Sequence, residues 1–420
     1  MSDLVRDLRY AARRLRQSPG FTVVAVLILA LSIAATGAIF TVVEAVILRP
    51  LPYQAPERLV RVTAELQRLG VQDAGLSAAE LFDYRDRTGL FDEITGVWPI
   101  TANLTGSSKA ERVETVMAGP EYFRLLGARP QLGRLFGPQD YQPGISPVVV
   151  ISDAFWRRGF GADPGVIGRT LRIDDDPYEV IGVTTSDFRH PSLTVETEAE
   201  VWAPSGWVAA PFQEPRHSRR FLPAAIGRLK PGITIEAAQA RLDAFAAELR
   251  RTYPDDYPPR TGWAPRILPL KQDLIASARP SLLIVMAAVL LVLTIGCANI
   301  ANLQLARASA RERDIAIRRA LGASATRMMR EQLAESLLVS LAGGLCGLVL
   351  TLWALDLLMQ LAPAALPRRS EIGFNWIVVA FSLGASVVTG LVFGLFPALQ
   401  AGRSSILGVL KGTGRGSAAT

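Results

Sequence analysis

Cysteine and histidine, which supply many metal ligands and catalytic groups, are scarce in this sequence. The 420 residues include two cysteines and two histidines. Cys297 and Cys346 both lie in long apolar runs, so the polar part of the chain has no disulfide framework. His190 and His217 are too few and too isolated for a histidine-based metal site or a histidine triad. These absences argue against an enzyme and against a metal centre.

Lysine is also rare, and none of the lysines follows a glycine-rich loop as Gly-Lys-Ser/Thr. Because that sequence cradles the phosphates of ATP in many ATPases, the chain lacks a Walker A motif. We therefore expect no cofactor in this chain. If ATP drives the protein, a separate subunit must bind it.

Hydrophobic residues are abundant instead. They make up 50% of the chain, and the mean hydropathy of +0.26 is high for a soluble protein. About 20 mainly apolar residues are needed to cross the roughly 30 Å hydrocarbon core of a membrane. The windows that meet this requirement are residues 21–48, 281–305, 333–361 and 374–399. The first is too long for the apolar part of a signal peptide, so we expect it to be a span.

Basic residues gather on one side of these windows. Residues 1–20 hold five, residues 307–330 hold seven and the tail 400–420 holds three. Loops rich in arginine and lysine stay in the cytoplasm, so we expect these three segments there and residues 49–280 outside. Residues 49–280 hold 28 basic and 29 acidic residues. The net charge of +7 thus reflects membrane topology and does not indicate binding to nucleic acid.

The first 20 residues combine an apolar and a basic helical face. Leu4, Leu8 and Leu15 recur at helical spacing on one side. The other side carries Arg6, Arg9, Arg13 and Arg16. This pattern predicts an amphipathic helix on the lipids of the inner leaflet. An ordinary soluble helix is the alternative.

Residues 49–280 have the pattern of a mixed α and β domain. Ser77 and Glu80 have the spacing of a capping box, which predicts a helix to about Arg87. Residues 235–252 repeat apolar side chains at helical spacing. Strands are expected at 57–62, 147–151, 171–173, 178–183 and 221–229. The acidic run 174–176 fits a hairpin turn between two of these strands better than a cation site.

The segment after the second window is among the most charged in the chain. Ile317 and Leu321 share one helical face, and Asp314 and Arg318 have the spacing and order of a helical ion pair. Gly322 stands where a glycine ends a helix. A loop that only keeps its side in the cytoplasm needs arginines alone, whereas an ordered apolar face fits docking onto another protein. The residues themselves leave both interpretations open.

At this point the sequence resembles a known family. The run CANIANLQLARASARERDIAIRRALGASATRMMREQLAESLLVSLAGGLCGL, residues 297–348, resembles the signature of the MacB and FtsX superfamily of ABC transporter permeases. PEYFRLLGARPQLGRLF and VVVISDAFWRRGFGADPGVIGRTLRIDDDPYEVIGV are similar to the family's periplasmic core domain. The resemblance implies an α-helical membrane protein with four transmembrane helices and a large α+β periplasmic domain inserted between helices 1 and 2.

In that family a short coupling helix after the second span docks on a separate nucleotide-binding subunit. The segment 306–332 is the matching part of this chain. The resemblance implies ATPase-coupling roles for Arg311, Arg313, Asp314, Ile315, Ile317, Arg318, Arg319, Leu321, Gly322 and Ala323.

The sequence also departs from the family. Asp314 stands where Glu is usual, and Glu44 stands where the first span commonly has Asn. Glu44 lies near the outer end of its window, where a carboxylate costs less than at the centre. It either reaches the lipid headgroups or has a substrate or proton role. The chain most resembles long orphan permeases that run on into a second copy of this unit, so it is either a single unit or half of that arrangement.

Small and amide side chains within the windows suggest helix contacts. Glycines four apart let helix backbones approach closely. These are Gly343, Gly347, Gly390 and Gly394, and we expect contacts there between spans or between protomers. Asn299 and Asn302 either form hydrogen bonds across helices or lie near the inner headgroups.

The sequence therefore predicts an inner-membrane permease subunit of an ABC-type complex. It would pass ATP-driven motion from a cytoplasmic ATPase subunit to a periplasmic domain, for export or extraction of a substrate. The resemblance implies a dimer of permease protomers and allows for a periplasmic adaptor and an outer-membrane channel. The alternative is an FtsX-like regulatory protein that recruits or activates a periplasmic partner without transport.

Overall fold

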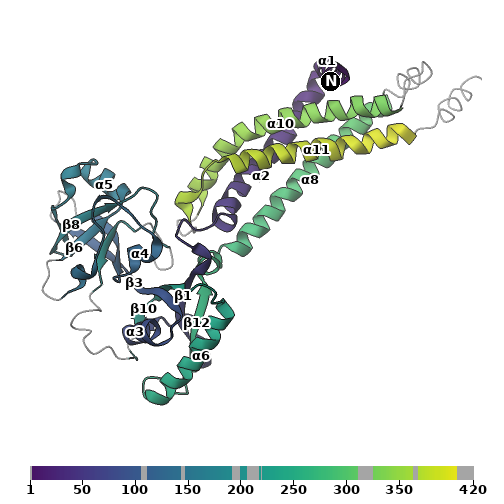
Figure 1. Ribbon diagram of the computed structural model, residues 1–420. Helices are drawn as coiled ribbons and strands as arrows, with labels where there is room; N and C mark the ends of the chain where they lie inside the picture. The colour runs from purple at the N-terminus through teal and green to yellow at the C-terminus, as the bar shows by residue number, and fades with distance from the viewer. Residues whose placement is uncertain are drawn as a thin grey trace, which may run out of the picture. The chain divides into compact units, whose positions relative to one another are not determined.

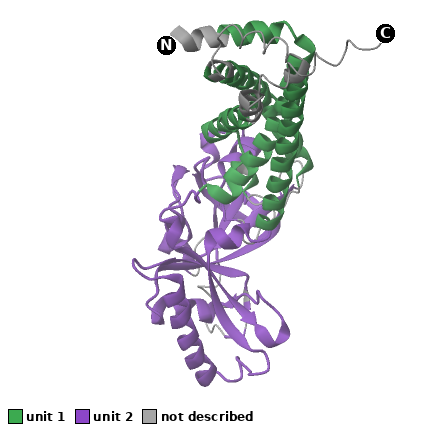
Figure 2. Cartoon of the chain, turned by 90° about the vertical axis from the view of Figure 1, so that its right-hand side faces the viewer, with its two compact units in different colours: residues 1–49, 278–420 green, residues 50–277 purple. Residues whose placement is uncertain are grey.

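A computed structural model describes residues 2–105, 111–142, 147–191, 199–205, 217–218, 220–310, 325–362 and 368–403. The chain divides into two compact units, which Figure 2 shows in different colours. Unit 1 comprises residues 1–49 and 278–420, and unit 2 comprises residues 50–277. Each unit is described by itself.

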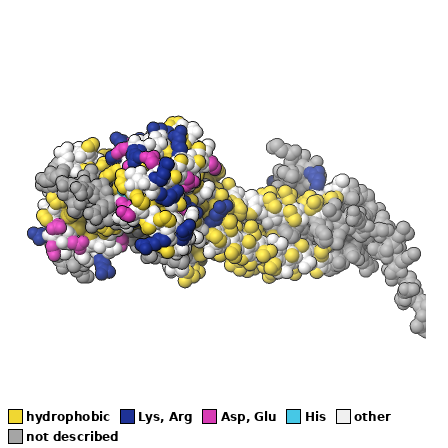
Figure 3. All heavy atoms as spheres, turned by 90° about the horizontal axis from the view of Figure 1, so that it is seen from below, with side chains coloured by type: hydrophobic (Ala, Val, Ile, Leu, Met, Phe, Trp, Pro, Cys, Tyr) yellow, Lys and Arg dark blue, Asp and Glu magenta, His cyan; other side chains and the backbone are white. Residues whose placement is uncertain are grey.

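Unit 1 is helical (Figure 1). Its elements are α1 (Ser2–Arg16), α2 (Pro19–Val43), a π-helical turn η1 (Glu44–Leu48), α8 (Arg279–Ala310), α10 (Ala325–Leu361), a short 3-10 turn η7 (Arg369–Glu371) and α11 (Trp376–Arg403). Seen as in Figure 3, the surface of the described helices is mostly hydrophobic, whereas charged side chains are frequent on unit 2. An apolar outer surface is what a helix bundle in lipid requires.

Three helices among the described residues are long and apolar enough to cross a membrane. They are Pro19–Leu48, Arg279–Arg307 and Met329–Leu361. The fourth predicted window lies on α11, where Trp376–Val392 forms a shorter apolar stretch. A membrane protein with an α+β domain fits these elements, and the number of four spans stays a prediction.

The predicted amphipathic helix at the N-terminus is present as α1. The part of its apolar face for which side chains are described packs inside unit 1, since Ala11 and Leu15 are buried. Leu15 lies in a cluster with Leu29 of α2, Cys297 of α8 and Val339 of α10. Within the chain, α1 therefore joins the helix bundle through this face.

Unit 2 is built on a ten-stranded sheet in the order β12-β1-β11-β3-β4-β9-β6-β8-β5, with β7 beside β3 and β8, and a separate pair of β2 and β10. Its strands are β1 (Leu59–Leu66), β2 (Leu76–Ser77), β3 (Phe91–Thr105), β4 (Glu111–Ala118), β5 (Pro130–Gly133), β6 (Val148–Ile151), β7 (Thr170–Ile173), β8 (Asp176–Thr184), β9 (Val201–Pro204), β10 (Arg220–Leu222), β11 (Ala224–Leu229) and β12 (Trp263–Pro269). Its α-helices are α3 (Ala78–Arg87), α4 (Tyr122–Leu126), α5 (Asp153–Phe160), α6 (Ile235–Thr252) and α7 (Leu270–Ile275).

The long strand β3 joins two parts of this sheet. Its first half pairs with β11 and its second half with β4, and its last residues pair with β7. Because β7 also pairs with β8, the strands β3, β4, β9, β6, β8 and β7 form a closed ring. One core lies where α3 and α6 cover the first part, and another lies where Phe155 and Trp156 of α5 meet the ring.

Several local predictions for unit 2 are confirmed. Ser77 and Glu80 form the capping box of α3, and α6 has the predicted bounds. Asp174 and Asp175 form the hairpin turn, with φ of 48° and 71°. The predicted strand 221–229 is wrong in one respect, because Pro223 separates β10 from β11.

Candidate functional site

The ten predicted coupling residues lie between Arg311 and Ala323. They fall in the segment 311–324, which lies outside the described residues. The two helices that flank this segment are described, since α8 ends at Ala310 and α10 begins at Ala325. We call the region where these two helix ends meet α1 the connector end of the bundle.

A buried carboxylate lies at the connector end. Glu335, ten residues into α10, keeps only 7% of its side chain exposed. Arg14 of α1 places Nη1 3.3 Å from Glu335 Oε2. Arg307 of α8 places Nη1 3.6 Å from Glu335 Oε1. Two arginines from different helices therefore share one acid of a third helix.

Arg307 also reaches the start of α2. Its guanidinium donates a hydrogen bond to Ser18 Oγ and lies over the ring of Phe21, 4.2 Å from the ring centroid. A guanidinium over an aromatic face is attracted by the ring electrons, most strongly where water is excluded. We call Arg14, Arg307 and Glu335 the connector triad. It ties the end of α1 and the last turn of α8 to α10, about three turns after α10 begins.

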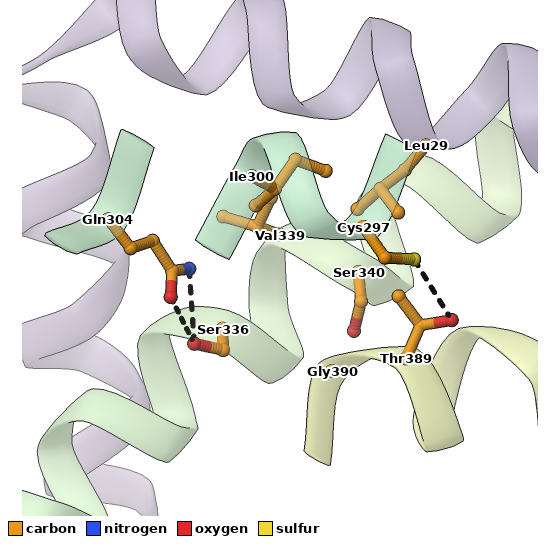
Figure 4. Close-up of a pocket in the computed structure, with 9 residues that line it drawn as sticks. All are labelled: Leu29, Cys297, Ile300, Gln304, Ser336, Val339, Ser340, Thr389 and Gly390. Atoms are coloured by element: carbon orange, nitrogen blue, oxygen red, sulfur yellow. Dashed lines mark hydrogen bonds between the residues drawn. The ribbon is translucent and has the colours of Figure 1, made fainter. Parts of the chain in front are cut away.

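A small pocket lies next to the triad, lined by residues of α2, α8, α10 and α11 (Figure 4). Gln304 of α8 exchanges hydrogen bonds with Ser336 of α10, at 3.2 Å from Nε2 and 3.3 Å from Oε1. The thiol of Cys297 donates a weak hydrogen bond to Thr389 Oγ1 of α11, with Sγ and Oγ1 3.8 Å apart. Interhelical side-chain bonds of this kind hold membrane helices together only weakly. The polar contacts of α8 here are therefore individually weak, beside the apolar packing of Cys297 and Ile300.

The predicted packing glycines lie at contacts between helices of the same chain. A Cβ on Gly343 would meet the Leu29 Cβ of α2 at 2.6 Å, and one on Gly347 would meet the Ala30 carbonyl oxygen at 3.0 Å. Gly390 and Gly394 of α11 lie against Ser340 and Ser336 of α10. Atoms at such distances would overlap, so these positions hold α10 close to both α2 and α11.

Gln304 makes an interhelical contact that the sequence analysis did not anticipate. Asn299 and Asn302, predicted either to form hydrogen bonds across helices or to lie near the inner headgroups, are exposed on α8, whereas Gln304 is buried. Gln304 follows Cys297 and Ile300 at helical spacing on the buried face. Glu335 was also missed. Its signal is an acid four residues before the buried Val339, and therefore on the same face of α10.

No group of His, Cys, Asp and Glu within the described ranges could hold a metal ion. What the connector end provides is a set of charge-assisted and polar contacts between helix ends. Such contacts suit a structural joint.

Known proteins resemble both parts of the chain. A family model described as a MacB-like periplasmic core domain matches residues 22–245, and one described as an FtsX-like permease C-terminal region matches residues 286–406. A macrolide export ATP-binding/permease protein MacB from Sodalis glossinidius is 26% identical over 319 residues, which cover 76% of this chain and 46% of that protein. The protein of the same name from Burkholderia pseudomallei is 26% identical over 291 residues, covering 68% and 41%.

The chain thus spans less than half the length of these curated relatives. Among solved structures, the periplasmic region of MacB from Actinobacillus actinomycetemcomitans is similar to 53% of this chain and 92% of that one, with 15% identity and a TM-score of 0.39. The apolar helices and the core-domain match fit an inner-membrane protein with a periplasmic domain. The chain belongs to the MacB/FtsX superfamily of ABC transporter permeases.

Proposed function

We propose that this chain is a permease subunit that passes ATP-driven movement from a separate cytoplasmic ATPase to its periplasmic unit 2. Unit 2 would then act on a substrate outside the inner membrane, for export or extraction. Family membership supports the permease role. The movement would enter the membrane bundle at the coupling segment and leave it toward unit 2.

The connector triad is the observation that carries the proposal. Residues 311–324 begin four residues after Arg307 and end eleven residues before Glu335. A push on this segment therefore acts first on the ends of α8 and α10, which the triad ties to each other and to α1. Because packed helices move as rigid elements, a displacement at these ends is transmitted along them.

An ATP-binding partner is supported by the names of the relatives. The curated relatives are named ATP-binding/permease proteins. ATP phosphates are commonly cradled by a Gly-Lys-Ser/Thr loop, which residues 1–420 do not contain. We propose that residues 311–323 dock on a partner that supplies this loop.

The proposed topology has four spans, with the termini and the coupling segment in the cytoplasm. We also propose that a second protomer completes the membrane part. In a single chain α8 leaves most of its side chains uncovered, among them Leu290, Leu291 and Ile295. A dimer contact and lipid would share this apolar surface.

Co-purification tests the proposal. The wild-type chain, extracted in mild detergent, should bring down an ATP-binding subunit, and Ile317→Asp or Arg318→Glu should lose it while still inserting in the membrane. Ile167→Asp and Arg251→Glu, at exposed positions of unit 2, are the matched controls and should keep the partner. Retention of the ATPase by both coupling variants would contradict the docking role.

A further inference from the structure

The other end of the bundle carries a second charged network. Here α2 ends in the π-helical turn η1, and Arg49 is the last residue of unit 1 before Pro50 of unit 2. The turn η7 and the start of α11 lie at the same end of unit 1. Glu44, predicted either to reach the headgroups or to have a substrate or proton role, is instead buried, with 4% of its side chain exposed.

Glu44 orients Arg49. The carboxylate accepts two hydrogen bonds from the guanidinium, at 2.7 Å from Nη2 to Oε2 and 3.3 Å from Nε to Oε1. Asn375, which precedes α11, donates to the same Oε2 at 3.0 Å. Held in this way, Arg49 donates through Nη1 to the backbone carbonyl of Glu371 at 2.9 Å.

Arg368 makes the matching contacts from the other segment. Its guanidinium donates to both carboxylate oxygens of Glu371, at 2.9 Å from Nε to Oε1 and 2.6 Å from Nη2 to Oε2. Arg368 Nη1 donates to the backbone carbonyl of Arg49 at 2.8 Å. Only 5% of its side chain is exposed, and its φ of 57° lies in the left-handed region, which a residue other than glycine adopts at a cost.

The two arginines thus exchange hydrogen bonds between two segments. Each is oriented by an acid of its own segment, and each donates to a backbone carbonyl of the other. Hydrogen bonds from a charged donor are stronger than neutral ones, and a bidentate carboxylate fixes the direction of the guanidinium. Because both acceptors are backbone carbonyls, their positions are fixed by the main chain and do not depend on the rotamer of an acceptor side chain.

We propose that Glu44, Arg49, Arg368 and Glu371 form a clamp that fixes the last turn of α2 to the segment between α10 and α11. The clamp makes the end of α2 and the segment that leads into α11 move together, and it delivers their movement to the backbone just before Pro50. It rests on the proposed function for its role in transmission. These are positioning residues, since none touches a substrate.

The clamp itself is tested in the resting protein, without an ATPase. Hydrogen exchange of the full chain in lipid nanodiscs should become about tenfold faster at residues 44–52 in Arg368→Gln. Arg369→Gln is the matched control, because Arg369 donates to the carbonyls of Met359 and Ala362 at the end of α10. It should speed exchange near 359–362 and leave 44–52 unchanged. Glu371→Gln, a milder change, should act on 44–52 in the same direction as Arg368→Gln.

Equal exchange at 44–52 in wild type, Arg368→Gln and Glu371→Gln would overturn the clamp.

The role of the clamp in transmission is measured in the complex with the co-purified ATPase, by comparing hydrogen exchange without nucleotide and with ATP plus vanadate. Arg368→Gln should keep the nucleotide response in α8 and α10 and lose it in unit 2, whereas Arg369→Gln should keep both. A response in unit 2 that survives in Arg368→Gln would refute transmission through the clamp. Absence of any response in wild type would instead refute the proposed function.

Discussion

Replacement of Glu335 by glutamine should release α1 from the bundle. Glu335 keeps 7% of its side chain exposed and pairs with Arg14 and Arg307, whose side chains are 24% and 21% exposed. Removing one partner of a fully buried ion pair costs roughly 3–5 kcal/mol. Because both arginines keep some access to water or headgroups, we expect a loss of about 2 kcal/mol, which is about a thirtyfold increase in opening of α1.

Hydrogen exchange at residues 9–16 measures this release, since exchange follows local opening. Glu331→Gln is the comparison, one turn earlier on the same helix and half-buried. The double variant Arg14→Gln/Glu335→Gln should lose less than the sum of the two single variants, because the pair is removed as a unit. Exchange at 9–16 that is equal in wild type, Glu335→Gln and Glu331→Gln would refute the connector triad as the link to α1.

Further substitutions test packing, protonation and burial. Gly343→Ala should lower the melting temperature, because overpacking costs about 1–3 kcal/mol of the free energy of unfolding. Gly384→Ala, with nothing within 4 Å of the added Cβ, should leave the melting temperature unchanged or raise it. Equal effects of the two substitutions would contradict the close approach of α10 to α2 at Gly343. Burial lowers the pKa of His190 to about 3 from 6.5, so the unfolded chain takes up a proton first as pH falls. The contribution of neutral His190 to the free energy of unfolding of unit 2 should be fully present above pH 6.5, and the free energy should be about 2 kcal/mol lower at pH 5. Hydrogen exchange of unit 2 measures this loss. The same loss in His190→Gln would show that protonation of His190 is not its cause. Glu80→Ala should destabilise unit 2 by about 3 kcal/mol or more in urea unfolding, because it leaves a buried arginine unpaired, and Glu65→Ala, from a more exposed pair, by less than about 1 kcal/mol.

Local signals in the sequence were sufficient for much of the fold. The capping box at Ser77, the helical repeat of 235–252 and the turn at Asp174 each depend on residues a few positions apart, and all three are found. The strands β3 and β4 pair with each other but were missed, because Gly96 and Pro99 are unusual inside a strand and the outer partners β11 and β9 lie far along the chain. The closed ring of strands likewise has no local signature.

The candidate site shows the same division. The apolar windows locate α2, α8 and α10, but they do not show that Glu335 pairs with Arg14 of α1, 321 residues away, and with Arg307 of α8, 28 residues away. Glu44 was interpreted from its depth in the window alone. Its charge is paired by Arg49 and Asn375, and the second of these lies just before α11, far along the chain. Tertiary contacts therefore decided which charged residues are structural.

Photocrosslinking from the coupling segment tests the central claim most directly. A photoreactive amino acid in place of Ile317, with the same residue in place of the exposed Ile167 of unit 2 as the control, can be activated in intact cells and the captured chain identified by mass. We expect Ile317 to capture a cytoplasmic chain with a Walker A motif and Ile167 not to do so. Capture of lipid or of this chain alone from position 317 would contradict an ATPase docked on this segment.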